Sequence, residues 1–187
     1  MKVLDYNYLA SLVRKAQSGD SNAFAELYVA TYQQQYRYAY KYLKDEHLAQ
    51  DAIQETYIHA LRSITKLQNP QLFIAWLNRI NFRTCFDLMR KPDKSRTDVV
   101  LGDRAEEVRS ESDHTENEVI EIDSRRYILK QVLNLPLTES QVILMKYYQG
   151  MSNDDIAAVM NISRSTVKRN LKSGKERLAR LLSEFRV

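Results

Sequence analysis

The chain has 187 residues, 44% of them hydrophobic, which suits one ordinary globular domain or two small ones. Only 4 glycines and 3 prolines occur and no long alternating strand appears, so the composition predicts an all-α protein. The single cysteine, Cys85, excludes an internal disulfide, and we find neither a signal-peptide run nor a bilayer-spanning apolar stretch. We therefore expect a cytoplasmic protein without direct membrane insertion.

The charge of the chain is unevenly distributed. Residues 1–91 carry 12 basic and 8 acidic groups, residues 92–124 carry 4 and 11, and residues 125–187 carry 12 and 5, giving net charges of +4, −7 and +7. Two basic blocks therefore flank an acidic one. This pattern predicts two small helical domains, 1–91 and 118–187, joined by a flexible acidic linker over 92–117.

The N-terminal block begins with two predicted helices. Leu4, Leu9 and Leu12 recur at helical spacing, and Gly19 with Asp20 marks the break and the next cap. The second helix extends from about residue 22 to residue 43 and carries a stripe of tyrosines. Such a stripe is more often packing and rim than a platform for stacked bases, and we interpret it as packing.

A third helix, from about residue 47 to residue 64, buries Leu61 among other apolar residues. Its other face presents Asp51, Gln54 and Glu55. Carboxylates one turn apart suit general acid–base catalysis, a divalent metal held with a nearby histidine (His47 or His59), docking of a basic protein surface, or plain solvation. No second cluster of metal ligands, no Gly-rich phosphate loop and no nucleophile motif occurs, so we expect no enzymic activity, no catalytic residue, no metal and no cofactor.

A polar loop over residues 65–69 leads into a fourth helix. Asn69 is a fitting N-cap and Pro70 a fitting first helical residue, and Pro92 ends the helix after residue 91. The predicted inner face carries Phe73, Trp76, Leu77, Ile80, Thr84 and Leu88, and the predicted outer face carries Asn78, Arg79, Arg83, Asp87 and Arg90. The outer arginines suit either an acidic surface or a phosphate backbone.

Residues 92–117 are rich in Asp, Glu, Ser, Arg and Thr, which predicts the flexible linker. Its negative charge suits either competition with DNA in the free protein or a solvated tether. Beyond it, one predicted helix stops at Pro136. Thr138 and Gln141 have capping-box spacing for another helix over residues 139–149.

The stretch from Gly150 to Leu178 predicts a helix-turn-helix. Ser152 suits the first cap, Asn161 tolerates the left-handed conformation at the turn, and Ser163 suits the second cap. On the second helix Val167, Leu171, Leu178 and Leu181 fall on the inner side. The other side is polar and basic, which fits the DNA major groove.

These motifs together resemble the extracytoplasmic-function (ECF) group of bacterial RNA polymerase sigma factors, over nearly the whole chain. The matching positions are Asp20 with Ala23-Phe24 and Leu27-Tyr28, Asp51 with Gln54-Glu55, Phe73 with Ala75-Trp76-Leu77, Ile80 and Asp87, and Asp155-Ile156-Ala157 with Thr166-Val167-Lys168. The resemblance implies that 1–91 is sigma domain 2 and 118–187 is sigma domain 4. It further implies a non-enzymatic factor that binds core RNA polymerase and directs promoter-specific initiation.

The resemblance also assigns roles to residues. Polymerase docking falls to Asp51, Gln54 and Glu55. Opening of the minus-ten element and capture of an unpaired base fall to Lys66, Gln68, Asn69, Asn78, Arg79 and Arg83. Reading of the minus-35 element falls to Arg164, Ser165, Thr166, Lys168, Arg169, Lys172 and Lys175. Core polymerase and promoter DNA are the implied partners, and an anti-sigma factor is left open.

The chain departs from the family pattern at several positions. Members commonly carry Arg-Asn where Phe82-Arg83 stands, and often Gly, Arg and Ala where Ser165, Asn170 and Gly174 stand. The alternative of another class is a helix-turn-helix regulator that acts by occupying DNA without docking on the polymerase.

Overall fold

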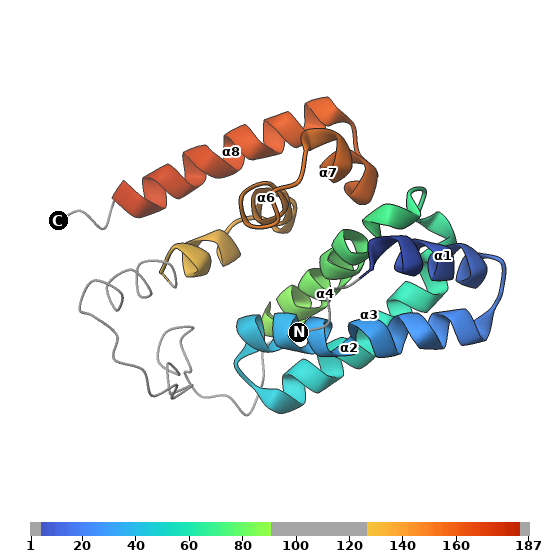
Figure 1. Cartoon of the computed structure of the whole chain (residues 1–187). Helices are drawn as coiled ribbons and strands as arrows, with labels where there is room; N and C mark the ends of the chain where they lie inside the picture. The colour runs from blue at the N-terminus through green and yellow to red at the C-terminus, as the bar shows by residue number, and fades with distance from the viewer. Residues whose placement is uncertain (1–4, 91–126, 184–187) are drawn as a thin grey trace, which may run out of the picture.

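The computed structural model describes residues 5–90 and 127–183 (Figure 1). This part of the chain is built from helices and contains no strand, which confirms the all-α prediction. The N-terminal unit comprises α1 (Tyr6–Gln17), α2 (Ser21–Leu43), α3 (Glu46–Ser63) and α4 (Phe73–Arg90). The linker predicted over 92–117 and the predicted boundary at 118 lie outside the described residues.

Aspartate side chains cap the N-terminal ends of α1 and α2. Asp5 Oδ1 accepts hydrogen bonds from Asn7 N at 2.9 Å and Tyr8 N at 3.1 Å, and Asp20 caps α2 in the same way. Each carboxylate satisfies backbone N–H groups that have no partner within the helix and favours the positive end of its dipole. The predicted break at Gly19, whose φ is +97°, is confirmed.

The core of the N-terminal unit lies between α2, α3 and α4 and includes Leu27, Ile53, Phe73 and Leu77. One sequence prediction fails here, because Leu61 is 56% exposed instead of buried. The tyrosine stripe lies along the rim of α2, mostly half-buried, with successive rings 5.3 to 6.3 Å apart. These side chains pack against neighbouring rings, which agrees with the interpretation from the sequence.

A buried polar network connects α2 with α4. Asn81 Nδ2 donates to the backbone and side-chain oxygens of Gln35, both at 2.9 Å. Gln35 Nε2 donates to Asn78 Oδ1 at 2.7 Å, and the thiol of Cys85 donates to Asn81 Oδ1 at 3.3 Å. Each buried amide therefore has a partner, which avoids the cost of an unpaired polar group in the core.

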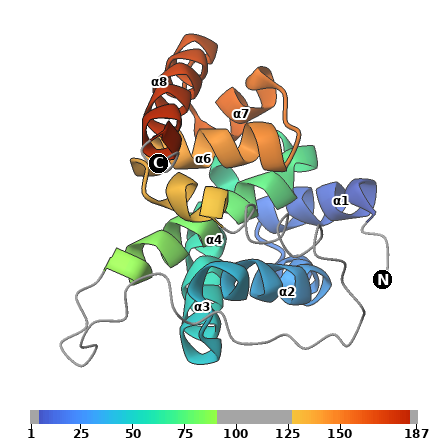
Figure 2. The ribbon, with the colours of Figure 1, turned by 90° about the vertical axis from the view of Figure 1, so that its left-hand side faces the viewer.

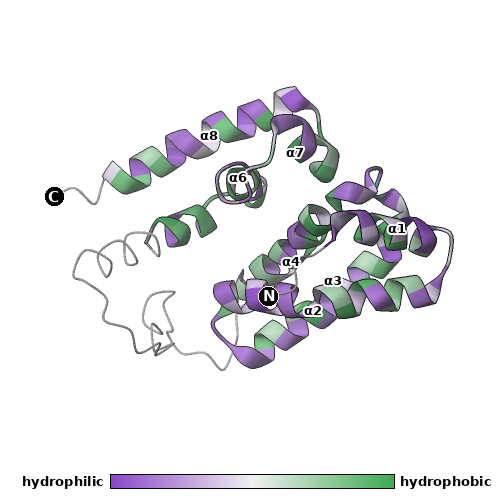
Figure 3. Cartoon of the chain, viewed as in Figure 1, coloured by the Kyte–Doolittle hydropathy of each residue, from purple (hydrophilic) through white to green (hydrophobic). Residues whose placement is uncertain are grey.

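The C-terminal unit contains a helical stretch over 127–133, α6 (Leu137–Ile143), a π-helical segment (Leu144–Tyr148), α7 (Asn153–Met160) and α8 (Arg164–Ser183). Figures 1 and 2 show this unit lying against α4, and α6 and α7 both contact that helix. Figure 3 shows hydrophilic residues along much of α8.

The predicted cap at Thr138 is wrong. The helix begins at Leu137, one residue after Pro136, and no side chain caps it. Glu139, in the first turn, points inward: its carboxylate accepts from Ser173 Oγ at 2.8 Å and lies 3.1 Å from Arg177 Nε on α8. These contacts tie α6 to α8, so Glu139 serves tertiary packing instead of capping.

Gly174 lies where α8 packs closely against α6. A Cβ added at this position would meet Ile143 Cδ1 at 2.6 Å and Glu139 Cβ at 3.4 Å. Glycine within a helix costs about 1 kcal/mol relative to alanine. The close approach of the two helices explains why a residue that is unfavourable for the helix occupies this site.

We expect Gly174→Leu to lower the free energy of unfolding by about 1–3 kcal/mol, because the added side chain has no room against Ile143. Gly174→Ala should change it by less than about 1 kcal/mol, since the gain in helix propensity offsets a shift of the flexible Ile143 side chain. Thermal melting measures both. Ala179→Leu, at an exposed position of the same helix, is the control. Equal melting of Gly174→Leu and wild type would contradict this account of the packing.

Candidate nucleic-acid interface

The helix-turn-helix predicted from the sequence is confirmed in its geometry. Ser152 Oγ accepts from Asp155 N at 3.1 Å and donates to Asp155 Oδ2 at 2.7 Å, which fixes the start of α7. Asn161 ends α7 in the left-handed conformation with φ of 53°. Ser163 Oγ then accepts from Thr166 N at 3.1 Å and starts α8. Two capped helices therefore meet at a short turn.

The outward face of α8 is polar and basic. Val167 and Leu171 are buried, while Leu178 and Leu181 are half-buried. The predicted DNA-binding residues that are exposed are Arg164, Ser165, Lys168, Arg169, Lys172 and Lys175. They form a continuous surface at which phosphates and base edges of a duplex can be contacted.

Four of the predicted DNA-binding residues also have contacts within the protein, among them Ser165, whose Oγ lies 2.8 Å from Ser163 Oγ. Thr166 is half-buried, and its hydroxyl lies 2.8 Å from Ser163 Oγ at the cap. Arg164 Nε lies 3.4 Å from Asp154 Oδ1, and Lys175 Nζ lies 5.1 Å from the centre of the Tyr147 ring. Because Arg164 and Asp154 are both well exposed, their interaction is weak and leaves Arg164 free to turn toward a phosphate.

The loop between α3 and α4 presents polar residues above two buried apolar ones. Ile64 and Leu67 are buried, whereas the predicted Lys66, Gln68 and Asn69 are exposed. Asn69 Oδ1 accepts from Gln71 N at 3.1 Å, so the predicted cap is confirmed. It caps a single 3-10 turn, Pro70–Leu72, and α4 itself begins only at Phe73, later than the sequence predicted.

The predicted outer face of α4 is partly wrong. Asn78 is only 9% exposed and belongs to the polar network with Gln35. Arg79 is half-buried: its Nη1 donates to the backbone oxygen of Val159 on α7 at 2.9 Å, and burial, aided by nearby Arg83, lowers its pKa. Only Arg83 of these three is exposed, 3.8 Å from Asp87. The C-terminal unit covers this stretch of α4, which the periodicity of one helix cannot reveal.

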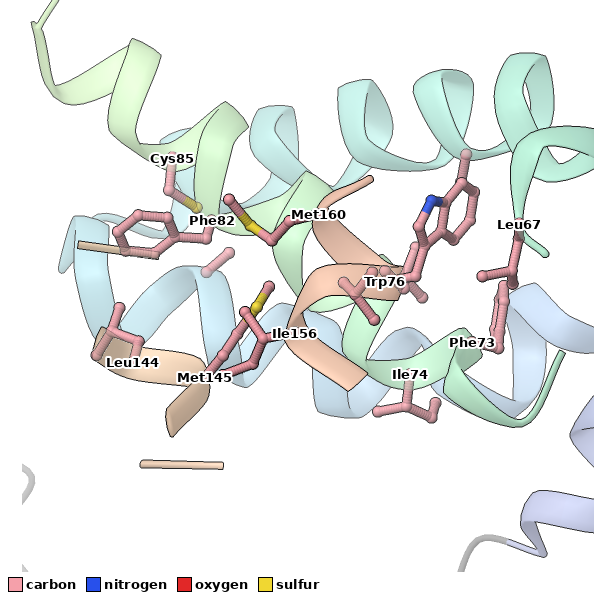
Figure 4. Packing of buried hydrophobic residues seen from close by; sticks show 14 of the residues in the cluster. Leu67, Phe73, Ile74, Trp76, Phe82, Cys85, Leu144, Met145, Ile156 and Met160 are labelled. Atoms are coloured by element: carbon pink, nitrogen blue, oxygen red, sulfur yellow. The ribbon is translucent and has the colours of Figure 1, made fainter. Parts of the chain in front are cut away.

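Apolar side chains complete the contact between the two units. Figure 4 shows Met145, Ile156 and Met160 of the C-terminal unit near Trp76 and Phe82 of α4, and all belong to one core cluster. At the edge, Lys41 Nζ lies 4.2 Å from the centre of the Tyr148 ring and donates to its hydroxyl. The sequence does not predict the contact between Lys41 and Tyr148, because residues 107 positions apart form no local pattern.

The face predicted to dock a protein lies on α3, where Asp51, Gln54 and Glu55 are all exposed. Glu55 Oε1 lies 3.6 Å from His59 Nε2, one turn further along the helix. Within residues 5–90 and 127–183, no group of three His, Cys, Asp or Glu side chains is arranged to hold a metal ion. The face is an exposed acidic and polar strip, well suited to meet a basic surface.

Cys85 lies in the core, and burial raises the pKa of its thiol to about 12. The thiol is therefore neutral at physiological pH, and we expect iodoacetamide at pH 8 to alkylate the folded protein at least about a hundredfold more slowly than the protein in urea. Mass spectrometry follows the adduct. Rapid alkylation of the folded chain would show that the thiol is accessible.

The fold and these surfaces define an all-helical protein that carries a helix-turn-helix and a separate exposed acidic face. The family model for "ECF sigma factor" matches residues 7–184, and the chain belongs to this family.

Similar proteins match over nearly the full chain. The ECF RNA polymerase sigma factor SigW of Bacillus subtilis is 28% identical over 92% of this chain and 96% of its own length. The ECF RNA polymerase sigma-E factor of Haemophilus influenzae is 27% identical over 89% and 90%. The solved structure of CnrH in complex with the cytosolic domain of CnrY has a similar fold, with a TM-score of 0.55 at 22% identity over 95% and 99%. No helix in the described residues is both long and apolar enough to span a membrane.

Proposed function

We propose that this chain binds core RNA polymerase and directs it to specific promoters, without catalysing a reaction itself. The match to the ECF sigma factor family over residues 7–184 carries this conclusion. Run-off transcription with purified core polymerase tests it, because a sigma factor starts transcripts at a promoter. The alternative, a regulator that occupies DNA without docking on the polymerase, would block transcripts and never start them.

The docking face on α3 is proposed to be Asp51, Gln54 and Glu55. Their exposure on the same helix supports a role toward a partner. Complementary charge at such a rim chiefly sets the association rate and the choice of partner.

We expect Glu55→Lys to weaken binding to core polymerase at least about tenfold, because the new charge meets a basic partner surface. Its melting should change little, since exposed substitutions usually alter stability by about 0.5 kcal/mol or less. Co-purification and a binding titration measure the effect. Glu176→Lys, the same charge reversal on exposed α8, is the control and should bind core polymerase normally. Normal binding of Glu55→Lys would remove the basis for the docking face.

The minus-35 element is proposed to be read by α8. The candidates are Arg164, Ser165, Thr166, Lys168, Arg169, Lys172 and Lys175, with Thr166 serving mainly the cap because its hydroxyl is already hydrogen-bonded to Ser163. Insertion of the first turns of α8 into the major groove would place the early residues at base edges and the later lysines at phosphates.

We expect the double variant Lys168→Ala, Arg169→Ala to bind promoter duplex more weakly. A lost base contact should cost about 1–3 kcal/mol and relax sequence preference, whereas each lost phosphate contact should reduce the salt slope by about 0.9. Titrations at several salt concentrations separate these two effects. The control is Arg14→Ala with Lys15→Ala, which removes the same charge from two exposed positions of α1. Unchanged affinity and preference would mean that α8 is not the reader.

The minus-ten element is proposed to be opened by the loop over 65–69 and by α4. Lys66, Gln68, Asn69 and Arg83 are exposed and accessible to a strand. Asn78 is buried with Gln35, and Arg79 lies under the C-terminal unit. If Arg79 contacts promoter DNA, its hydrogen bond to Val159 on α7 must first break. We therefore propose that the two units separate when the polymerase complex engages the melted strand. An anti-sigma factor stays an open proposal for a partner of the free chain.

A further inference from the structure

Gln17, at the end of α1, spans from the first helix to the loop between α3 and α4. Its Nε2 donates to the backbone oxygen of Ile64 at 2.9 Å and to that of Leu67 at 2.8 Å. Both bonds are partly buried, and the two carbonyls lie 47 and 50 residues further along the chain. One amide group therefore holds two points of the loop with both of its N–H donors.

The loop is held in other ways as well. Leu67 N donates to Ile64 O at 3.1 Å and closes the turn, while the Ile64 and Leu67 side chains are buried beneath it. On the far side of the loop, Gln71 Nε2 donates to Asn7 Oδ1 at 3.0 Å, which gives α1 a second, exposed anchor. Figure 1 shows α1 beside this loop, and α1 contacts both of its 3-10 turns.

Between these anchors the side chains that remain outside are polar. Thr65, Lys66, Gln68 and Asn69 are exposed, and the fixed backbone sets their spacing. A loop that is already ordered binds a ligand without the entropy loss of ordering. Any ligand of this loop therefore benefits from the bonds that Gln17 makes, although Gln17 itself is covered by the loop.

We propose that Gln17 is a positioning residue for promoter melting, which holds the 65–69 loop in the shape that captures an unpaired base of the minus-ten strand. This proposal rests on the proposed function. Gln17 touches no DNA; it acts through the carbonyls of Ile64 and Leu67 and so through the exposed side chains between and beside them. Without its amide, the loop retains its buried side chains and the Leu67–Ile64 backbone bond but loses the two bonds that fix its carbonyls against α1.

The test uses holoenzyme reconstituted from core polymerase and the full chain. The probe is a fork-junction promoter DNA whose minus-ten non-template strand is single-stranded and carries 2-aminopurine at the position that unstacks with the wild type. Gln17→Leu, which keeps the volume and removes both donors, should bind the preferred strand about tenfold more weakly and lose the rise in fluorescence. Gln33→Leu, the same substitution at an exposed position of α2, should behave as wild type.

Base discrimination separates positioning from a general loss of structure. For Gln17→Leu the ratio of affinities between the preferred base and the other bases should fall about tenfold, while binding to core polymerase and to minus-35 duplex stays unchanged. An unchanged ratio would overturn the proposal, as would parallel loss of duplex and core binding. A second variant, Gln17→Glu, replaces the donors by a carboxylate that repels the two carbonyls, and it should discriminate no better than Gln17→Leu.

Failure of the proposed function has a different signature. If wild-type chain starts no transcript with core polymerase, the sigma factor assignment fails whatever Gln17 does. If wild type starts transcripts and captures the base, and Gln17→Leu keeps both the affinity and the discrimination, only the role of Gln17 fails.

Discussion

Burial of α4 from two sides is the constraint on which the rest of the structure depends. This helix carries buried residues at nearly every turn, and they point in several directions: Phe73, Ile74, Trp76, Leu77, Asn78, Asn81, Phe82, Thr84, Cys85 and Phe86. A helix that is buried over so much of its circumference cannot be covered by one neighbouring layer. α2 and α3 cover one side, and α6 and α7 of the C-terminal unit cover another. α4 therefore belongs to the cores of both units.

This shared helix links the candidate surfaces physically. The loop proposed to capture a base leads directly into α4, and the exposed face of α3 lies on the same bundle. α7, the first helix of the helix-turn-helix, contacts α4 through Val159 and Arg79. The contact combines apolar side chains with one charged group that donates to a backbone oxygen. Such a contact holds the units together while leaving a polar group that water or a phosphate can satisfy after separation.

Buried polar residues fix how the helices pack against one another. The bonded amides of Gln35, Asn78 and Asn81 fix the register of α2 against α4. Glu139 does the same between α6 and α8 through Ser173 and Arg177. Each pair joins distant parts of the chain, so each is satisfied in only one arrangement of the helices. Gly174 adds a steric condition, because it lets α8 approach Ile143 closely.

The helices, their caps and their exposed faces were largely determined by the sequence alone, because they depend on local interactions. Helix periodicity, the caps at Asp20, Ser152 and Ser163, and the left-handed Asn161 depend on residues within a few positions of one another, and the structure confirms them. The same holds for the exposed basic face of α8 and the exposed acidic face of α3, since periodicity separates the two sides of a helix. Family membership followed from the same local motifs taken together.

The burial and hydrogen bonding of residues that contact distant parts of the chain were decided only by the tertiary structure. Asn78 and Arg79 lie on a face that local periodicity assigns to solvent, but Asn78 is buried with Gln35 of α2 and Arg79 is covered where α7 packs. Leu61 is apolar and yet 56% exposed, whereas Ala60 and Ile64 at the same end of α3 are buried. Gln17 looks like an ordinary polar residue at a helix end until the loop more than forty residues later brings two carbonyls to its amide. In each case the deciding contact joins segments whose relative position the sequence pattern does not encode, because burial and hydrogen bonding are properties of the packed chain.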